Sequence, residues 1–388
     1  MRIAGIIAEY NPFHNGHARH IALTRAATGC DHVIVCMDGH FSQRGEAAIA
    51  SKWARARMAL SCGADAVFEL PAIFAVRTAD AFARGGVAIL GGLGADWLSF
   101  GAETDDMELL RALARLRAEE PPEVSAAIRA GLDVGMSHAR ARGEAVGEYL
   151  GVAPEAIHQP NMTLAAEYLR AQEALAPNMK PVAIRRNVGY HERALGEFAP
   201  AAAIRAAFAR GETARALEAI PPEARQFAMP DAMHDMDDML MLCLRGMSAE
   251  DMACLPDVGE GLENRLYRLC RETSTREALL EGLKCKRYTR ARLSRLLTHA
   301  LLGVTQAQLD ANPTPAYARL LGVRAGAEGL LAELSARATM PIVSSAAALR
   351  GNPVFDLECR ATDVWALLHD DPALRLPGRE FTEKFIRM

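Results

Sequence analysis

Two histidines near the N-terminus, His14 and His17, are the residues whose types and spacing most directly suggest chemistry. They stand three positions apart, which on a helix brings two side chains to the same side of a turn. Gly16 lies between them and has no side chain that would keep a ligand away from the backbone. Imidazole N–H groups beside the free backbone N–H groups at the start of a helix attract an anion. The spacing therefore suits a triphosphate.

The residues around this motif predict the elements that position it. Residues 3–8 (IAGIIA) form a short apolar run, which is typical of a buried strand in a parallel sheet. Asn11-Pro12 blocks a direct run from this strand into a helix, because the residue before proline avoids helical geometry. A helix is expected to begin near His14 and to continue to about Ala26. The order of strand, tight loop and helix N-terminus is that of an anion-binding site.

Strands and helices go on alternating through the first half of the chain. Further buried strands are predicted at 31–37, 66–70, 95–100 and 180–184, with helices at 51–61 and 78–90 between them. This alternation predicts an α/β fold with a Rossmann-like, doubly wound parallel sheet. Ligands of such sheets bind beyond the carboxyl ends of the strands. The loops at 9–17, 38–46 and 101–103 should meet there.

The domain organisation is predicted from where strand patterns stop. Residues 105–147 lack a strand pattern and should form a helical insertion of two helices separated at 120–122. The first domain is predicted to span 1–211 with this insertion. From residue 212 to 388 the patterns are almost entirely helical, with one or two small strands near 340–343. We therefore expect a mainly helical C-terminal domain.

Composition narrows the class of protein. The chain has 388 residues, half of them hydrophobic, and a formal net charge of −4. No apolar run approaches the roughly 20 residues of a membrane span, and the N-terminus has no export-signal pattern. The eight cysteines have no Cys-x-x-Cys spacing, so neither a disulfide scaffold nor a zinc site is indicated. We expect a cytoplasmic globular protein with no membrane partner.

A basic stretch in the C-terminal half is the candidate surface for nucleic acid. Basic side chains that surround an aromatic ring suit contacts with RNA phosphates and bases. A solvated helix face is the alternative interpretation, since basic helices often have no partner. The residues are Lys284, Lys286, Arg287, Arg290 and Arg292, with Tyr288 among them.

Taken together, segments along the whole chain resemble the tRNA(Met) cytidine acetate ligase family, which belongs to the nucleotidylyltransferase superfamily with the HxGH motif. The resemblance implies a nucleotidylyltransferase-like domain that uses ATP to activate acetate as acetyl-adenylate. It also implies transfer of the acetyl group to N4 of the wobble cytidine of elongator tRNA(Met). The matching segments are 10–17 (YNPFHNGH), 41–46 (FSQRGE), 52–53 (KW), 68–71 (FELP), 100–103 (FGAE), 160–161 (PN), 167–168 (EY), 189–191 (GYH), 260–265 (EGLENR) and 286–292 (KRYTRAR).

The resemblance also implies a site. His14 and His17 would be catalytic, donating hydrogen bonds to the phosphates in the transition state. Mg2+ is expected with the triphosphate, ligated mainly by phosphate and water, so no protein metal ligand is predicted. The implied ATP site comprises Ile7, Ala8, Glu9, Tyr10, Asn11, Pro12, Phe13, His14, Asn15, Gly16, His17, His20, Gly101, Asn161 and Arg185.

Two departures from the family pattern keep other functions open. Residues 199–203 (APAAA) lack the Ser/Thr hydroxyls that the family has before Arg205. Asp38 stands where a small serine is usual, which would place negative charge near a phosphate site. One alternative is adenylyl transfer to a small phosphorylated metabolite without RNA. The other is a diverged protein that binds nucleotide or tRNA without turnover.

Overall fold

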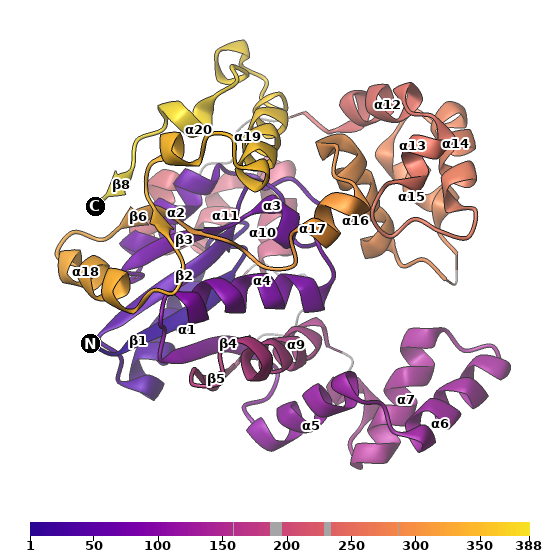
Figure 1. Ribbon diagram of the computed structural model, residues 1–388, viewed down its shortest axis with the longest axis horizontal. Coiled ribbons are helices and arrows are strands. Elements are labelled where there is room, and N and C mark those ends of the chain that lie inside the picture. The colour runs from indigo at the N-terminus through magenta and orange to yellow at the C-terminus, as the bar shows by residue number, and fades with distance from the viewer. Residues whose placement is uncertain (158, 187–195, 229–233, 286) are drawn as a thin grey trace.

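One mixed sheet forms the centre of the molecule. The computed structural model describes residues 1–157, 159–186, 196–228, 234–285 and 287–388 (Figure 1). Within these residues eight strands are hydrogen-bonded in the order β5-β4-β1-β2-β3-β6-β7, and β8 also pairs with β6. The strands are β1 (Ile3–Ala8), β2 (His32–Asp38), β3 (Ala66–Leu70), β4 (Trp97–Ala102), β5 (Lys180–Arg185), β6 (Ala318–Val323), β7 (Ile342–Val343) and β8 (Ile386–Arg387).

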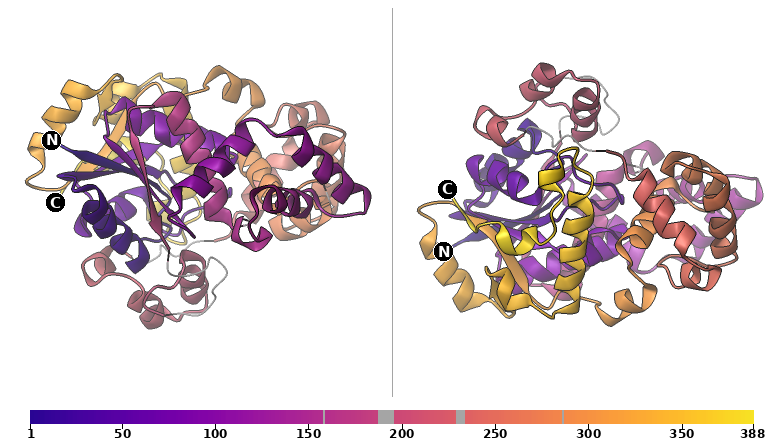
Figure 2. Two further views of the ribbon diagram at one scale, coloured as in Figure 1. Left: turned by 90° about the horizontal axis from the view of Figure 1, so that it is seen from below. Right: turned by 90° about the horizontal axis from the view of Figure 1, so that it is seen from above.

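The five strands predicted from apolar runs are all present. Strands β1 to β5 are mutually parallel where they pair, so their carboxyl ends share one edge. Alternate side chains of β1 enter different cores, as the period of two in a strand requires. Ile3 and Ile7 belong to one hydrophobic core, whereas Ala4 and Ile6 belong to another. The sheet is therefore buried on both faces, and Figure 2 shows helices on both sides of it.

Each face has its own helices. The core that contains Ile3 is completed by α3 (Ala72–Ala75), α4 (Ala79–Gly92) and α9 (Pro160–Leu175). The core that contains Ala4 is completed from the other side. Its helices are α1 (Asn15–Thr28), α2 (Lys52–Ser61), α10 (Ala201–Ala209), α11 (Thr213–Glu218) and the 3-10 helix η1 (Pro222–Phe227).

A helical insertion follows β4, as predicted, but it has more helices than expected. It comprises α5 (Met107–Ala118), α6 (Pro122–Asp133), α7 (His138–Leu150) and the short α8 (Pro154–Ile157). The second predicted helix is split because Gly135 adopts φ +89° and ends α6. Ser137 then caps α7 by accepting a hydrogen bond from the backbone N–H of Arg140. The insertion projects at the lower right of Figure 1.

A second helical part, which we call the helical lobe, lies above the insertion in the same view. It consists of α12 (Asp237–Gly246), α13 (Ala249–Ala253), α14 (Leu262–Glu272), α15 (Arg276–Leu283) and α16 (Arg290–Leu302), and it has a separate hydrophobic core. After α17 (Gln306–Ala311) the chain returns to the sheet. Its last elements are β6, α18 (Glu328–Arg337), β7, η2 (Ala346–Leu349), α19 (Pro353–Ala366), η3 (Pro372–Leu374), α20 (Arg379–Thr382) and β8.

This return corrects the predicted division at residues 211 and 212. Helices α11 and η1 lie after that boundary yet pack in the core of the sheet. Strand β6, more than 100 residues later, pairs antiparallel with β3 and is buried throughout. Without β6 the strand β3 would be an open edge with unpaired backbone groups. Among the described residues, only those of the helical lobe form a core separate from the sheet.

Candidate active site

The two motif histidines lie at the N-terminus of α1, directly beyond the end of β1. His14 is the N-cap residue, and its Nδ1 accepts a hydrogen bond of 3.0 Å from the backbone N–H of Gly16. Nδ1 of His17 accepts a hydrogen bond of 3.2 Å from the backbone N–H of His14. Because both Nδ1 atoms are acceptors, each neutral ring carries its proton on Nε2. The two rings stack with their centroids 3.7 Å apart.

Both imidazoles are held in the neutral form. Burial, assisted by the positive charge of Arg186, lowers the pKa of His14 from 6.5 to about 3. Burial and the neighbouring groups His14, Arg186 and His20 lower the pKa of His17 well below its usual value. Two neutral rings with protonated Nε2 atoms are hydrogen-bond donors that keep their protons at physiological pH.

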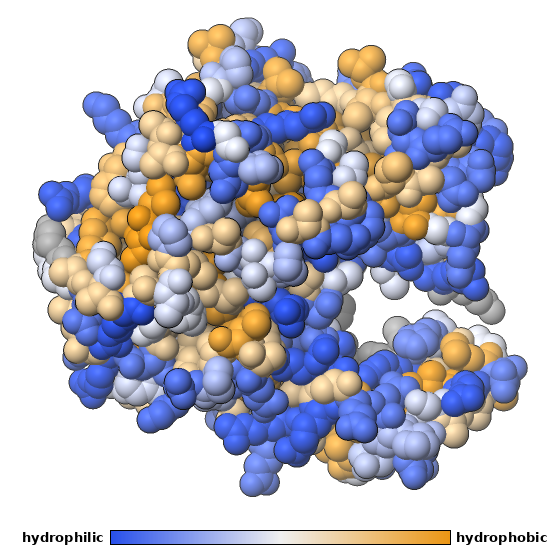
Figure 3. All heavy atoms as spheres, in the orientation of Figure 1, coloured by the Kyte–Doolittle hydropathy of each residue, from blue (hydrophilic) through white to orange (hydrophobic). Residues whose placement is uncertain are grey.

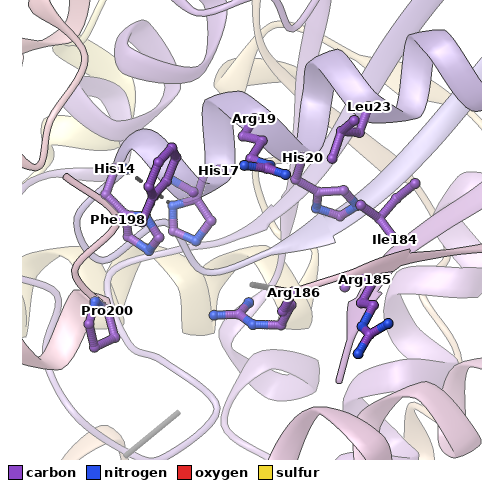
Figure 4. A pocket seen from close by; sticks show the side chains of 12 residues that line it. His14, His17, Arg19, His20, Leu23, Ile184, Arg185, Arg186, Phe198 and Pro200 are labelled. Atoms are coloured by element: carbon purple, nitrogen blue, oxygen red, sulfur yellow. Dashed lines mark hydrogen bonds between the residues drawn. The ribbon is translucent and has the colours of Figure 1, made fainter. Parts of the chain in front are cut away.

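These histidines border a cavity of about 610 Å³ that is open to solvent. The lining comes from α1, the ends of β4 and β5, and residues 198–200 before α10 (Figure 4). The lining residues are His14, Gly16, His17, Arg19, His20, Leu23, Gly101, Ile184, Arg185, Arg186, Phe198 and Pro200. Among them are three arginines and no carboxylate, so the cavity suits an anion.

Arg185 and Arg186 are adjacent at the end of β5, and they differ in whether they face His14 and His17. Figure 4 shows the side chain of Arg186 extending toward His14 and His17, whereas that of Arg185 points away from them. Arg185 is exposed at the mouth. Successive side chains at a strand end point in opposite directions. The charge that faces the histidines is therefore that of Arg186, although the family resemblance had implied Arg185.

The two predicted glycines lie beside these side chains, but only Gly16 is required to make room for one of them. A Cβ atom on Gly16 would lie only 2.8 Å from Cε1 of His14, so a side chain there would displace the folded-back imidazole. The sequence had given Gly16 another role, room for a nucleotide. A Cβ atom on Gly101 would lie 3.4 Å from Cγ of Arg186. Gly16 thus positions His14, whereas the distance at Gly101 is an ordinary van der Waals contact that a side chain could make.

His20 is fixed by a buried hydroxyl chain. Its Nε2 lies 3.0 Å from Oγ of Ser99, which is 2.7 Å from Oγ1 of Thr24. The Thr24 hydroxyl donates to the backbone carbonyl of His20 over 2.8 Å. Ser99 therefore donates to Thr24 and accepts from Nε2–H of His20. Burial and Arg186 lower the pKa of His20 from 6.5 to about 4.

Several lining residues were missed by sequence reasoning. Arg19 and Leu23 were not predicted. They share one helix face with the predicted residues Gly16 and His20, so the spacing of the motif could have indicated them. Ile184 and Arg186 come from the predicted strand end. Phe198 and Pro200 carried no usable signal, since only the tertiary structure brings that segment to α1.

Nine residues of the predicted ATP site are not among the lining residues, and several of them make contacts that hold the surrounding loops. Glu9 Oε1 accepts a hydrogen bond of 2.9 Å from the backbone N–H of Gln43, and Asn11 Oδ1 accepts one of 3.0 Å from Ile49. Asn161 Nδ2 donates to Glu103 over 2.7 Å. These contacts tie the loops beyond β1, β2 and β4 together. The nine residues are Ile7, Ala8, Glu9, Tyr10, Asn11, Pro12, Phe13, Asn15 and Asn161.

Aromatic packing and backbone contacts complete the support. The rings of Tyr10 and Phe13 pack against His17, with centroid distances of 4.7 and 5.5 Å. Asn15 Nδ2 donates to the carbonyls of Glu197 at 2.7 Å and Glu218 at 3.2 Å, which anchors the start of α1 to the segment around α10 and α11. The histidines are therefore held from the side opposite the cavity.

Neither departure from the family pattern places a carboxylate in the cavity. Asp38 is buried, and its Oδ1 accepts a hydrogen bond of 2.7 Å from Arg55, so its charge is paired away from the lining. The alanine-rich segment forms the start of α10, with Pro200 at the N-cap. Arg205 donates to the carbonyl of Asn11 over 2.8 Å and thus braces the loop. The N-terminus of α10 therefore lies beside the cavity without the hydroxyl groups that the family has there.

The predicted RNA cluster is largely paired with carboxylates. Arg287 forms an ion pair with Glu260, and Arg290 contacts Glu277 and Glu281. Lys284 Nζ lies 3.7 Å from Glu281.

The last members of the cluster differ from these. Arg292 donates to the carbonyl of Asp257 over 2.7 Å and lies 4.8 Å from the ring centroid of Tyr288. Lys286 lies outside the described residues. In the part of the chain that the structure describes, no helix is both long and apolar enough to cross a membrane.

Comparisons with known proteins place the site in a family. Residues 1–376 match the family described as HIGH Nucleotidyl Transferase. The chain is 34% identical to the tRNA(Met) cytidine acetate ligase of Acetivibrio thermocellus, covering all of both chains. It also resembles the crystal structure of apo Thermotoga maritima TmcAL, with a TM-score of 0.91, 29% identity and full coverage of both chains. A second structure of that protein, bound with alpha-thio ATP, gives a TM-score of 0.89 at 29% identity over 100% of this chain and 99% of the other. The chain belongs to the HIGH nucleotidyl transferases and, within them, to the tRNA(Met) cytidine acetate ligase family.

Proposed function

We propose that this protein uses ATP to activate acetate as acetyl-adenylate and transfers the acetyl group to N4 of the wobble cytidine of elongator tRNA(Met). The observation that carries the proposal is the pair of neutral imidazoles, His14 and His17, beside Arg186 in an anion-binding cavity. The full-length match to ligases of this name supports the particular reaction. We place the enzyme in the cytoplasm, where its tRNA substrate is found.

In the first step a carboxylate oxygen of acetate attacks the α-phosphorus of ATP. The bond between that phosphorus and the bridging oxygen breaks, and pyrophosphate leaves with the electron pair. Acetate is already ionised at neutral pH, so no protein base is needed. The Nε2–H groups of His14 and His17 and the guanidinium of Arg186 stabilise the negative charge of the transition state. Their role is donation and positioning, since neutral imidazoles with lowered pKa values do not titrate near pH 7.

In the second step N4 of cytidine attacks the acetyl carbon. AMP leaves with the electron pair of the broken bond, and N4 loses one proton to solvent or to the leaving phosphate. No covalent bond to the protein forms in either step. This agrees with the cavity lining that the described residues form, which contains no serine, cysteine, lysine or carboxylate.

The same lining tests whether Mg2+ fits. Magnesium prefers oxygen ligands, and among the described residues the side chains that line the cavity offer nitrogen and hydrocarbon only. Mg2+ therefore fits as a companion of the triphosphate, held by phosphate oxygens and water. In that place it would neutralise part of the phosphate charge, while His14, His17 and Arg186 orient the nucleotide.

Transfer of labelled acetate tests the proposal. The purified protein is incubated with labelled acetate, ATP and Mg2+, with and without elongator tRNA(Met), and both pyrophosphate and label in RNA are measured. We expect acetate-dependent pyrophosphate release and label in the tRNA. Pyrophosphate release without labelled RNA would overturn the acceptor and favour another adenylyl-transfer reaction. Nucleotide binding with neither product would favour a protein that has lost turnover.

A further inference from the structure

One face of α16 is packed on the loops beyond β2 and β3. Oγ1 of Thr298 donates to the carbonyl of Gly45 over 2.8 Å, and Nε2 of His299 lies 2.5 Å from the carbonyl oxygen of Val76. Arg292, Arg295 and His299 stand at positions i, i+3 and i+7 of this helix, so they share a face. Arg77 follows Val76 in the chain, and its charge acts on both His299 and Arg295.

Buried nitrogen atoms without hydrogen-bond partners gather on this face. Among the described residues, Nε of Arg292, Nε of Arg295 and Nδ1 of His299 are buried and unpartnered. Arg295 is only 7% exposed. No carboxylate oxygen in the described ranges lies within 4.0 Å of the guanidinium nitrogens of Arg77 or Arg295. A buried guanidinium without an ion pair is costly, which makes this arrangement unusual unless a ligand completes it.

The charges around Arg295 favour an anion. Burial lowers the pKa of Arg295, and the nearby positive charges of Arg292 and Arg77 lower it further. Asp257 and Asp80 act in the opposite direction without forming an ion pair with Arg295. With Asp310, which acts on Arg77, three carboxylates lie in the surroundings of the three guanidinium groups, and none of them forms an ion pair with Arg77 or Arg295. A phosphate oxygen between the arginines would supply both the missing acceptor and the missing charge.

The position of this face points to the kind of anion. It lies at the junction of the helical lobe with the carboxyl edge of the sheet, the same edge that carries the catalytic cavity. Figure 3 shows the surface hollowed between the helical lobe and the insertion. Such a hollow can hold a nucleic acid strand that passes the sheet edge. Three other basic residues of the predicted RNA cluster, Lys284, Arg287 and Arg290, are instead paired with acidic side chains.

We propose that Arg77, Arg292 and Arg295 form a binding site for a backbone phosphate of the tRNA. The proposal rests on the proposed function, since it assumes that tRNA is the acceptor. Arg77 and Arg292 are partly accessible and contact the phosphate, whereas the more deeply buried Arg295 adds its charge. The site fixes where the tRNA backbone crosses the protein and reads no base.

The experiment measures binding of an elongator tRNA(Met) transcript at several salt concentrations. The variants are Arg77→Ala, Arg77→Lys and Arg292→Ala, and thermal unfolding checks that each is folded. Arg268→Ala is the matched control, because this exposed arginine of the helical lobe pairs with Glu272. Arg77→Ala and Arg292→Ala should weaken binding roughly tenfold and reduce the slope of log K against log salt by about 1. Arg77→Lys should keep the slope, and Arg268→Ala should match wild type.

Two results would overturn the site: tRNA affinity of Arg77→Ala within about twofold of wild type, or weaker binding with an unchanged salt slope. Acetate-dependent exchange of pyrophosphate into ATP by the wild-type protein, measured without tRNA, tests the proposed function separately. If no pyrophosphate exchange is detected but the salt slope of tRNA binding still depends on Arg77, the proposed reaction is overturned and the phosphate site is supported.

Discussion

Two buried groups of ionisable side chains in this protein differ in how their charges are satisfied. In the catalytic cavity, His14, His17 and Arg186 direct donors at a space that has no carboxylate among its described lining residues. Around Lys52, which is 0% exposed, the charges meet one another. Lys52 contacts Glu69 and Glu380 and lies 3.2 Å from Glu358.

The Lys52 group is a structural connection. Arg319 adds contacts of 2.8 Å to Glu69 and 2.5 Å to Glu380, so strands and helices from both ends of the chain are joined. Glu358 and Glu380 are also close enough to His40 to hold a metal ion, but the ammonium of Lys52 already supplies the cation there. Breaking a buried group of paired charges is costly because it leaves a charge uncompensated, whereas the Nε2–H groups of His14 and His17 border a cavity that can hold a ligand.

Among the substitutions that test this comparison, removal of Lys52 should have the largest effect. Lys52→Met leaves buried carboxylates with only Arg319 to balance them, and we expect a loss of about 3–5 kcal/mol in the free energy of unfolding. Urea denaturation measures it. Lys180→Met replaces an exposed lysine at the start of β5 and should change stability by no more than about 0.5 kcal/mol. Equal effects of the two substitutions would contradict the structural role of Lys52.

Removal of a cavity donor should affect catalysis rather than stability. His14→Ala deletes an Nε2–H donor to the phosphates, and we expect adenylate formation to fall by about two orders of magnitude. Acetate-dependent pyrophosphate exchange measures this rate, and the unfolding midpoint checks the fold. His138→Ala, at an exposed position in the insertion, is the matched control. A near-normal rate for His14→Ala would remove the assigned role.

The smallest effect should appear in the pH dependence of stability. His20 has its pKa lowered from 6.5 to about 4. As the pH falls below 6.5, the unfolded chain takes up a proton that the folded protein does not, so stability present above that pH is lost. The loss is at most about 1.4 kcal/mol per pH unit for one group. His20→Gln should therefore show a shallower fall in unfolding free energy than wild type between pH 6.5 and about pH 5.

In the Lys52 group, Glu358 should change stability with pH in the opposite direction. Burial and the charge of Glu69 raise the pKa of Glu358 from 4.5 to about 8. Its folded form keeps a proton that the unfolded chain loses, so its contribution is present below pH 4.5 and is lost as the pH rises to about 8. Glu358→Gln should flatten the stability curve in that range. Identical pH slopes for wild type and both variants would contradict the two assignments.

Much of the fold could be predicted because it depends on local patterns. The apolar runs at 3–8 and 66–70 identify buried strands, and Asn11-Pro12 followed by His14 identifies a loop and a helix start. The cavity lining includes six residues of the predicted ATP site: His14, Gly16, His17, His20, Gly101 and Arg185. Side-chain period and capping are properties of neighbouring residues, so the sequence alone carries them.

Other features depend on contacts between distant segments. The pairing of β6 with β3 joins Arg319 to Glu69, 250 positions away, and Lys52 reaches Glu380 across 328 positions. No local pattern encodes such partners, since they are chosen by packing of whole elements. The same holds for Phe198 at the cavity and for Arg295 beside Arg77.

The sequence by itself thus determined the β1–α1 unit with its two histidines, because strand period, proline geometry and helix capping act over a few residues. Only the tertiary structure decided that Arg186 rather than Arg185 faces them, that β6 completes the sheet and that the basic cluster of the helical lobe is mostly paired. Those outcomes depend on which surfaces meet and which charges are left without partners, and that is settled when the separate parts of the chain pack together.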